Sequence, residues 1–124
     1  MRFLFICGCG HSGTSLLLAI FSAANDVHAL TDETHFLLSH STCEFKSQYG
    51  YLAQGGNLIV EKTPKHVYAL DKIVADPECG ALVMVRNPVD VIASLKREVL
   101  MFNRVSNAIE TTTNSGLPAK RPRE

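Results

Sequence analysis

The sequence lacks several features that mark common classes of protein. It has no tryptophan, and its 12 basic residues are balanced by 12 acidic ones, so its formal net charge is zero. A neutral chain has no overall field that would attract nucleic acid or an anionic membrane surface, and we expect neither as a partner. Its apolar runs are shorter than the roughly 20 residues that span a bilayer, so the sequence predicts a cytoplasmic protein.

The sequence also lacks the spacings that are typical of metal sites. Its four cysteines form no CxxC pair, and its histidines show no HExxH or zinc-finger spacing. We therefore expect no metal site. Cys7 and Cys9 are explained more simply as small apolar residues at the end of a strand.

Apolar strands that run into helices are present three times. The strands are expected over Arg2–Cys7, "LIVE" and "ALVMV". Strands that alternate with helices indicate parallel βαβ units, so the predicted fold is α/β, a three-layer, P-loop-like parallel sheet flanked by helices. Ligands of such sheets bind at the carboxyl ends of the strands. The polar motifs "GCGHSGTS", "EKTPKH" and "RNPVDVIAS" all lie there.

The other segments are assigned from local signals. We expect a helix over Thr14–Ala23, a short strand over Val27–Leu30, a helix that opens at Asp32 and Glu33, and a loop with broken helix over Ser41–Gly56. Helices should also follow the two later strands. Thr63 and Asn87 can cap these helices, since a proline follows each of them.

The composition becomes polar from Ser106 onward, with three successive threonines and a basic end. Such a segment has few side chains with which to build a core. We therefore expect one domain over residues 1–105 and a disordered tail over residues 106–124.

The glycine-rich loop after the first strand is typical of an anion site, because glycines let backbone N–H groups converge on an anion at a helix N-terminus. The NTPase pattern GxxxxGK[ST] would place a phosphate-binding lysine where this sequence has Thr14. Glu61, at a strand end, keeps a magnesium-dependent kinase or NTPase open as an alternative. Arg86, at the next strand end, favours instead a second anion held directly by the protein, as in a nucleotide with a phosphate on its ribose.

Taken together, the motifs resemble those of sulfotransferases that use 3′-phosphoadenosine 5′-phosphosulfate (PAPS). "GHSGTSLL" is similar to their 5′-phosphosulfate loop, and "RNPVDVIAS" to their 3′-phosphate motif. "EKTPKHVY" resembles a lysine-bearing segment of heparan-sulfate-type members, and "DETHF" their acidic segment. The resemblance covers about residues 3–101. Full family domains are longer, so it implies the N-terminal portion of a sulfotransferase domain, incomplete at its C-terminal side.

The resemblance implies PAPS as the co-substrate and a role for each matching residue. Six loop residues would bind the 5′ group: Gly10, His11, Ser12, Gly13, Thr14 and Ser15. Arg86 and Ser94 would bind the 3′-phosphate. Glu33 would be the general base, Lys62 would lie near the transferred group, and His11 would stand where members usually carry lysine or arginine.

The acceptor implied by the resemblance carries a hydroxyl group, on a sugar, a tyrosine or a small alcohol. A catalytically incomplete nucleotide-binding protein is the alternative function. Glu33 also has a plainer interpretation as a helix-start carboxylate that complements the helix dipole, and Lys62 as a solvated side chain. Glu61 should point away from Lys62 by strand alternation, and could brace the loop or the neighbours of Lys62.

In kinase-like P-loop sheets the first strand lies centrally, so the resemblance places it here between the strands that lead to Lys62 and Arg86. The stretch "ALVMV" is apolar on both faces, which is typical of an interior strand, yet no further strand is found to pair with it. An open edge of this kind invites pairing with another chain. We therefore expect a homo-oligomer through this edge, aggregation, or marginal stability.

Overall fold

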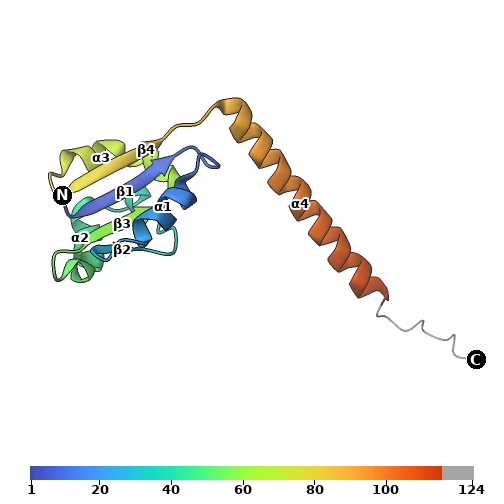
Figure 1. Cartoon of the computed structure of the whole chain (residues 1–124), viewed down its shortest axis with the longest axis horizontal. Coiled ribbons are helices and arrows are strands. Elements are labelled where there is room, and N and C mark those ends of the chain that lie inside the picture. Colours follow the sequence, from blue (N-terminus) through green and yellow to red (C-terminus); the bar gives the residue numbers. More distant parts are fainter. Residues whose placement is uncertain (116–124) are drawn as a thin grey trace, which may run out of the picture. The chain divides into compact units, whose positions relative to one another are not determined.

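The structure, a computed structural model, describes residues 1–115. It comprises a compact unit over Met1–Asn87 and a second unit that begins at Pro88. The first unit contains one parallel sheet with the strand order β2-β3-β1-β4 (Figure 1). The expected α/β fold is thus confirmed, with the first strand between those that lead to Lys62 and Arg86.

The bounds of the elements are as follows. The strands are β1 (Phe3–Gly8), β2 (Val27–Ala29), β3 (Leu58–Lys62) and β4 (Cys79–Met84). The α-helices are α1 (Thr14–Ser22), α2 (Thr42–Tyr49), α3 (Leu70–Ala75) and α4 (Pro88–Ser115). Short 3-10 helices are η1 (Phe36–Leu38), η2 (Gly50–Ala53) and η3 (Pro64–Ala69).

Helices cover both faces of the sheet in the first unit, which gives the three expected layers. Side chains of β1 alternate between the two faces, and all of them are buried. Phe3 and Phe5 join the larger hydrophobic cluster, to which α2 and α3 contribute. Leu4 and Ile6 join a smaller cluster that α1 covers. β1 is therefore the strand around which both halves of the core form.

The helix expected to open at Asp32 and Glu33 is absent, and that prediction is wrong. Only the short η1 follows these residues. His35 has a left-handed backbone, with φ 52°, which a right-handed helix does not accommodate. Glu33 therefore lies in a loop, so its interpretation as a helix-start carboxylate is excluded.

The segment expected to be a loop with broken helix, Ser41–Gly56, contains the regular helix α2 followed by the short η2, so it is more helical than predicted. Ser41 and Glu44 form a capping box at its start: Glu44 N–H donates to Ser41 Oγ at 3.2 Å, and Ser41 N–H donates to Glu44 Oε2 at 2.8 Å. The S-x-x-E spacing that signals this motif is present in the sequence. The helix buries Phe45, whose ring meets that of Phe5 edge-on at 4.9 Å.

The second unit begins with α4, as expected from Pro88. The helix continues past the predicted domain boundary at residue 105 as far as Ser115. The first part of the predicted tail is therefore helical, and residues 116–124 lie outside the described residues. None of the helices within residues 1–115 is long and apolar enough to cross a bilayer.

An ion-pair cluster ties α2 to the segment before β4. Lys46 Nζ lies 2.7 Å from Asp76 Oδ2 and 3.0 Å from Glu78 Oε2. Hydrogen bonding to Lys46 lowers the pKa of Asp76 from 3.8 to about 2. Because the pKa of this carboxyl group is lower in the folded chain, its stabilising effect is complete above about pH 4 and is lost as the pH falls toward 2.

Removal of the lysine charge tests this linkage. Lys46→Met should lower the free energy of unfolding by about 1 kcal/mol near neutral pH, which is the upper end of the range for accessible pairs. The deficit should shrink as the pH falls from about 4 to about 2, because protonated Asp76 no longer attracts the lysine. Urea unfolding of both proteins across this range measures it, with the exposed Lys65→Met as control. A deficit that does not change with pH would assign the effect to packing of the Lys46 stem.

The position of β4 gives a second prediction. Within the described residues β4 pairs only with β1, and its residues Leu82 and Val83 are 38% and 45% exposed. Amide exchange over Leu82–Val85 should therefore be faster than over Phe3–Ile6.

The open side of β4 also predicts that the chain self-associates. Val83→Lys should shift it toward monomer, since a charge on an edge strand opposes pairing. Light scattering and hydrogen exchange measure both effects. A monomer with equal protection in the two strands would contradict the prediction.

Candidate functional site

The glycine-rich loop joins the end of β1 to the start of α1. Gly8 has φ 143°, and Met84 of β4 lies so near that a side chain at this position would collide with its carbonyl. Gly13 has φ 94° and provides the N-cap of α1 without a side-chain hydrogen bond to the helix. The first backbone N–H groups of α1 thus have no side-chain cap, and the positive end of the helix can accept an anion.

The hydroxyl groups of the loop lie in two different environments. Ser12 and Thr14 are 5% and 4% exposed, and Ser12 Oγ donates a hydrogen bond to the carbonyl of Cys9. The Ser12 side chain thus supports the loop from within. Ser15, in the first turn of α1, is exposed.

Arg86 follows β4 and lies against the loop. Its Nη1 donates to the backbone carbonyl of His11 at 2.9 Å, and His11 itself has a left-handed backbone with φ 61°. The structure thus brings together Arg86 and the glycine-rich loop, as their positions at adjacent strand ends predict. Ser94 belongs to α4 and hence to the second unit, so its pairing with Arg86 stays a prediction.

Glu33, Lys62 and Ser15 meet although they come from three separate segments. Lys62 Nζ, at the end of β3, lies 2.5 Å from Glu33 Oε1 and 3.1 Å from Ser15 Oγ. His35 Nε2 lies 3.6 Å from the other carboxylate oxygen of Glu33. The Lys62 side chain is only 12% exposed. Its interpretation as a solvated lysine is therefore wrong.

Glu61 points away from Lys62, as strand alternation predicts, and lies in the interior with 1% exposure. Its Oε1 accepts hydrogen bonds from the N–H and hydroxyl of Thr34, both at 3.1 Å, and from the hydroxyl of Thr63. Its Oε2 lies 2.9 Å from His66 Nδ1. Burial raises the pKa of Glu61, but the hydrogen bonds from His66 and Thr63 outweigh this effect and leave it below its usual value.

Sequence reasoning missed the part that Thr34, Thr63 and His66 play around this carboxylate. Thr63 was expected to cap a helix, but η3 begins without a side-chain cap. Its hydroxyl instead accepts a hydrogen bond from His35 N–H at 3.3 Å. The available signal was the presence of Glu61 and Thr63 directly after the apolar residues of β3. Buried polar groups need hydrogen-bond partners, so these side chains indicated a polar network at this strand end.

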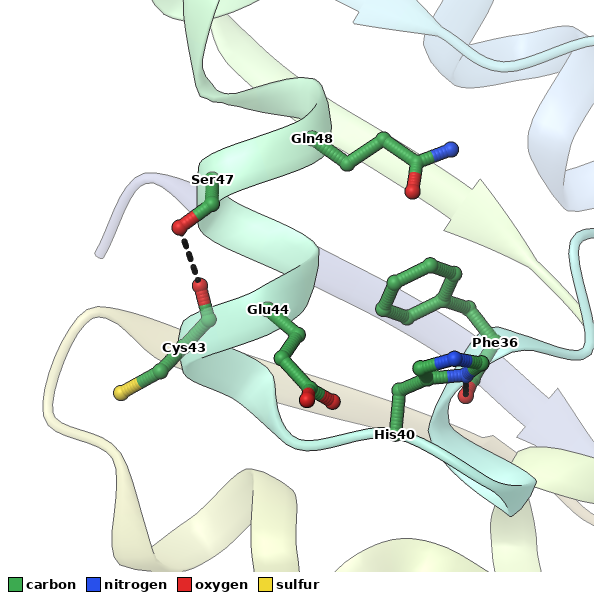
Figure 2. Close-up of a pocket in the computed structure, with 6 residues that line it drawn as sticks. All are labelled: Phe36, His40, Cys43, Glu44, Ser47 and Gln48. Atoms are coloured by element: carbon green, nitrogen blue, oxygen red, sulfur yellow. Dashed lines mark hydrogen bonds between the residues drawn. The ribbon is translucent and has the colours of Figure 1, made fainter.

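An open hollow of about 490 Å³ lies beside α2 (Figure 2). It is lined by Phe36, His40, Cys43, Glu44, Ser47 and Gln48. The rings of Phe36 and His40 stack at 4.4 Å, and Phe36 also packs against the larger hydrophobic cluster. None of the residues expected to bind PAPS or to act in catalysis lines this hollow, so we assign it no part in the site. The described residues contain no group of three or more His, Cys, Asp or Glu that could hold a metal ion.

The site therefore combines three chemical capacities at the carboxyl ends of the strands. The start of α1 can accept an anion, Glu33 can accept a proton, and Lys62 can stabilise negative charge near both.

A comparison with family models finds a match to a sulfotransferase domain over residues 2–115. Searches of curated proteins and of solved structures found no match. Because the family match spans most of the sequence and agrees with the P-loop-like α/β fold, the chain belongs to the sulfotransferase family.

Proposed function

We propose that the chain binds PAPS and transfers its sulfuryl group to the hydroxyl group of an acceptor. The observation that carries this proposal is the meeting of Glu33, Lys62 and Ser15 next to the start of α1. A carboxylate and a cation thus lie beside a helix end that can accept an anion, which supports roles for them as base and electrostatic stabiliser.

The residues present suit a nucleotide with anionic groups at both its 5′ and 3′ positions. The 5′ group would lie at the start of α1, on N–H groups that no side chain caps. There Ser12 and Thr14 would contribute mainly through their backbone, because their side chains are buried. The guanidinium of Arg86 has five N–H donors, so it can hold the carbonyl of His11 and still donate to a 3′-phosphate. The proposed binding set is Gly10, His11, Ser12, Gly13, Thr14, Ser15, Arg86 and Ser94.

When bound, PAPS supplies a sulfuryl group whose leaving group is a phosphate. Glu33 would take the proton of the acceptor hydroxyl as that oxygen bonds to sulfur and the bond from sulfur to the bridging oxygen breaks. Lys62 would stabilise the charge that develops, and His11 would assist at the bridging oxygen. An anion on the loop would lie near Lys62 and compete with Glu33 for its ammonium group. The ion pair between Lys62 and Glu33 would then be weaker. The carboxylate would then be freer to accept the proton.

The acceptor is proposed to be a sugar, a tyrosine or a small alcohol, and the protein is proposed to act in the cytoplasm. A magnesium-dependent kinase or NTPase is less well supported. Glu61, the carboxylate that could have served a nucleotide-bound magnesium, is buried among Thr34, Thr63 and His66.

Incubation with sulfur-labelled PAPS and a panel of sugar, phenol and alcohol acceptors tests the proposal, together with calorimetric binding of adenosine 3′,5′-bisphosphate. Transfer to an acceptor would support it. Nucleotide binding without transfer to any acceptor would select a catalytically incomplete binding protein. Neither binding nor transfer would contradict both functions.

Arg86→Ala tests the 3′-phosphate site. We expect about tenfold or greater loss of affinity for adenosine 3′,5′-bisphosphate, because a charged hydrogen bond contributes about 1.5–3 kcal/mol. Affinity for the analogue without the 3′-phosphate should hardly change. Calorimetry with both ligands measures the difference. Equal losses for the two ligands would show that Arg86 acts by supporting the loop through His11.

Glu33→Gln tests the general base. Turnover should fall by about 10²–10⁴-fold, because the amide cannot take the acceptor proton. Nucleotide affinity should be kept. The adjacent, exposed Asp32→Asn removes the same charge and serves as the matched control in steady-state assays. A Glu33→Gln variant as active as this control would reject the assignment.

A further inference from the structure

Three backbone N–H groups of the segment that carries Glu33 are held by side chains from one other segment. Thr34 N–H donates to Glu61 at 3.1 Å, His35 N–H to Thr63 at 3.3 Å, and Leu37 N–H to His66 Nε2 at 3.2 Å. All three acceptors lie within residues 61–66. We call Thr34, Glu61, Thr63 and His66 the Glu61 network.

The contacts of His66 and Glu61 indicate where the protons of the Glu61 network lie. Because Nε2 of His66 accepts from Leu37 N–H, the proton of the neutral ring is on Nδ1, and it faces Glu61 Oε2 at 2.9 Å. Glu61 Oε1 accepts from Thr34 and Thr63. Glu61 Oε1 thus accepts three hydrogen bonds, whereas Oε2 lies close to the His66 ring without a hydrogen bond of its own.

Burial gives the Glu61 network its rigidity. Glu61, Thr63 and His66 are 1%, 0% and 0% exposed. A buried carboxylate without partners is costly, so displacement of any donor is opposed. The backbone bond from Leu30 N–H to the carbonyl of Val60, at 2.9 Å, guides the segment alongside β3. Beyond it, the bonds to the Glu61 network hold the segment in place.

We propose that Glu61, Thr34 and His66 are positioning residues that hold Glu33 against Lys62. Glu33 adjoins Thr34, and Glu61 adjoins Lys62, so the bond between Thr34 and Glu61 sets the distance between the other two side chains. The proposal rests on the proposed function, in which Glu33 acts as the base. It also gives a reason for the sequence Glu-Lys-Thr at residues 61–63. Glu61 and Thr63 hold the segment that carries Glu33, and Lys62 between them points toward the proposed site.

Two substitutions disturb the Glu61 network without touching Glu33 or Lys62. Glu61→Gln keeps the shape but turns an –NH₂ donor toward the N–H of His66, so that ring and amide cannot both be satisfied. Thr34→Val removes only a hydroxyl from a half-buried residue, and Thr34→Ser restores it. Glu44→Gln is the control, because it removes a carboxylate but keeps the capping box of α2.

The first measurement is independent of activity. A carbodiimide joins a carboxylate to an amine that touches it, and the amide between Glu33 and Lys62 is quantified by mass spectrometry. Its yield should fall at least about fivefold in Glu61→Gln and Thr34→Val, and stay unchanged in Thr34→Ser and Glu44→Gln. Amide exchange of Thr34, His35 and Leu37 should accelerate by about tenfold in Glu61→Gln, as expected for loss of about 1.4 kcal/mol. Unchanged cross-linking in both disturbing variants would overturn the proposal. If Glu61→Gln does not fold, unchanged cross-linking in Thr34→Val alone would overturn it.

The second measurement separates positioning from a merely structural role. In Thr34→Val, kcat should fall by about 10²-fold, since displacement by about 1 Å has such effects, while affinity for adenosine 3′,5′-bisphosphate stays within about twofold. Thr34→Ser should restore kcat. Equal losses in kcat and in nucleotide affinity would overturn the positioning role. If the unmodified chain transfers no sulfuryl group, the proposed function fails, whereas cross-linking still decides whether the Glu61 network holds Glu33.

Discussion

The parallel pairing of β1 with a strand on each side is the constraint on which the site depends. Ile6 pairs with Lys62 on one side, and Gly8 pairs with Met84 on the other. The glycine-rich loop therefore starts where the Lys62 strand and the Arg86 strand also end. Because every side chain of β1 is buried, this register is fixed by packing on both faces. Packing of the apolar side chains of β1 therefore brings the glycine-rich loop, Lys62 and Arg86 together.

Strand alternation gives neighbouring residues opposite environments at the end of β3. Glu61 is enclosed by donors in the interior, whereas Lys62 reaches Glu33 and Ser15. Glu61 is thus held by hydrogen bonds on one face of the strand, whereas Lys62 on the other face pairs with Glu33. One short segment thereby provides both the support of the site and its cation.

The parts of the fold that could be predicted are those set by local pattern. The apolar strands and the glycine loop follow from residues close in sequence, and so does the direction in which Glu61 points. The strand order follows instead from the likeness to kinase-like P-loop sheets. The loop that carries Glu33 could not be predicted in the same way, because its partners Glu61 and Thr63 lie 27 and 28 residues from Thr34 and His35. Local propensity favoured a helix there, and these distant hydrogen bonds outweighed it. The α2 helix is different, since its start is encoded locally by the capping box of Ser41 and Glu44.

The concentration of donors on Glu61 also has an evolutionary meaning. A change at position 34, 61, 63 or 66 that removes the hydrogen-bonding group leaves its partner without that bond, whereas coordinated changes could replace the whole set. These four positions should therefore vary together among sulfotransferases that share this arrangement. Covariation of positions 34 and 61 would follow from the hydrogen bond between their side chains, and would identify relatives in which the acidic loop is held in the same way even where the glycine-rich loop has diverged.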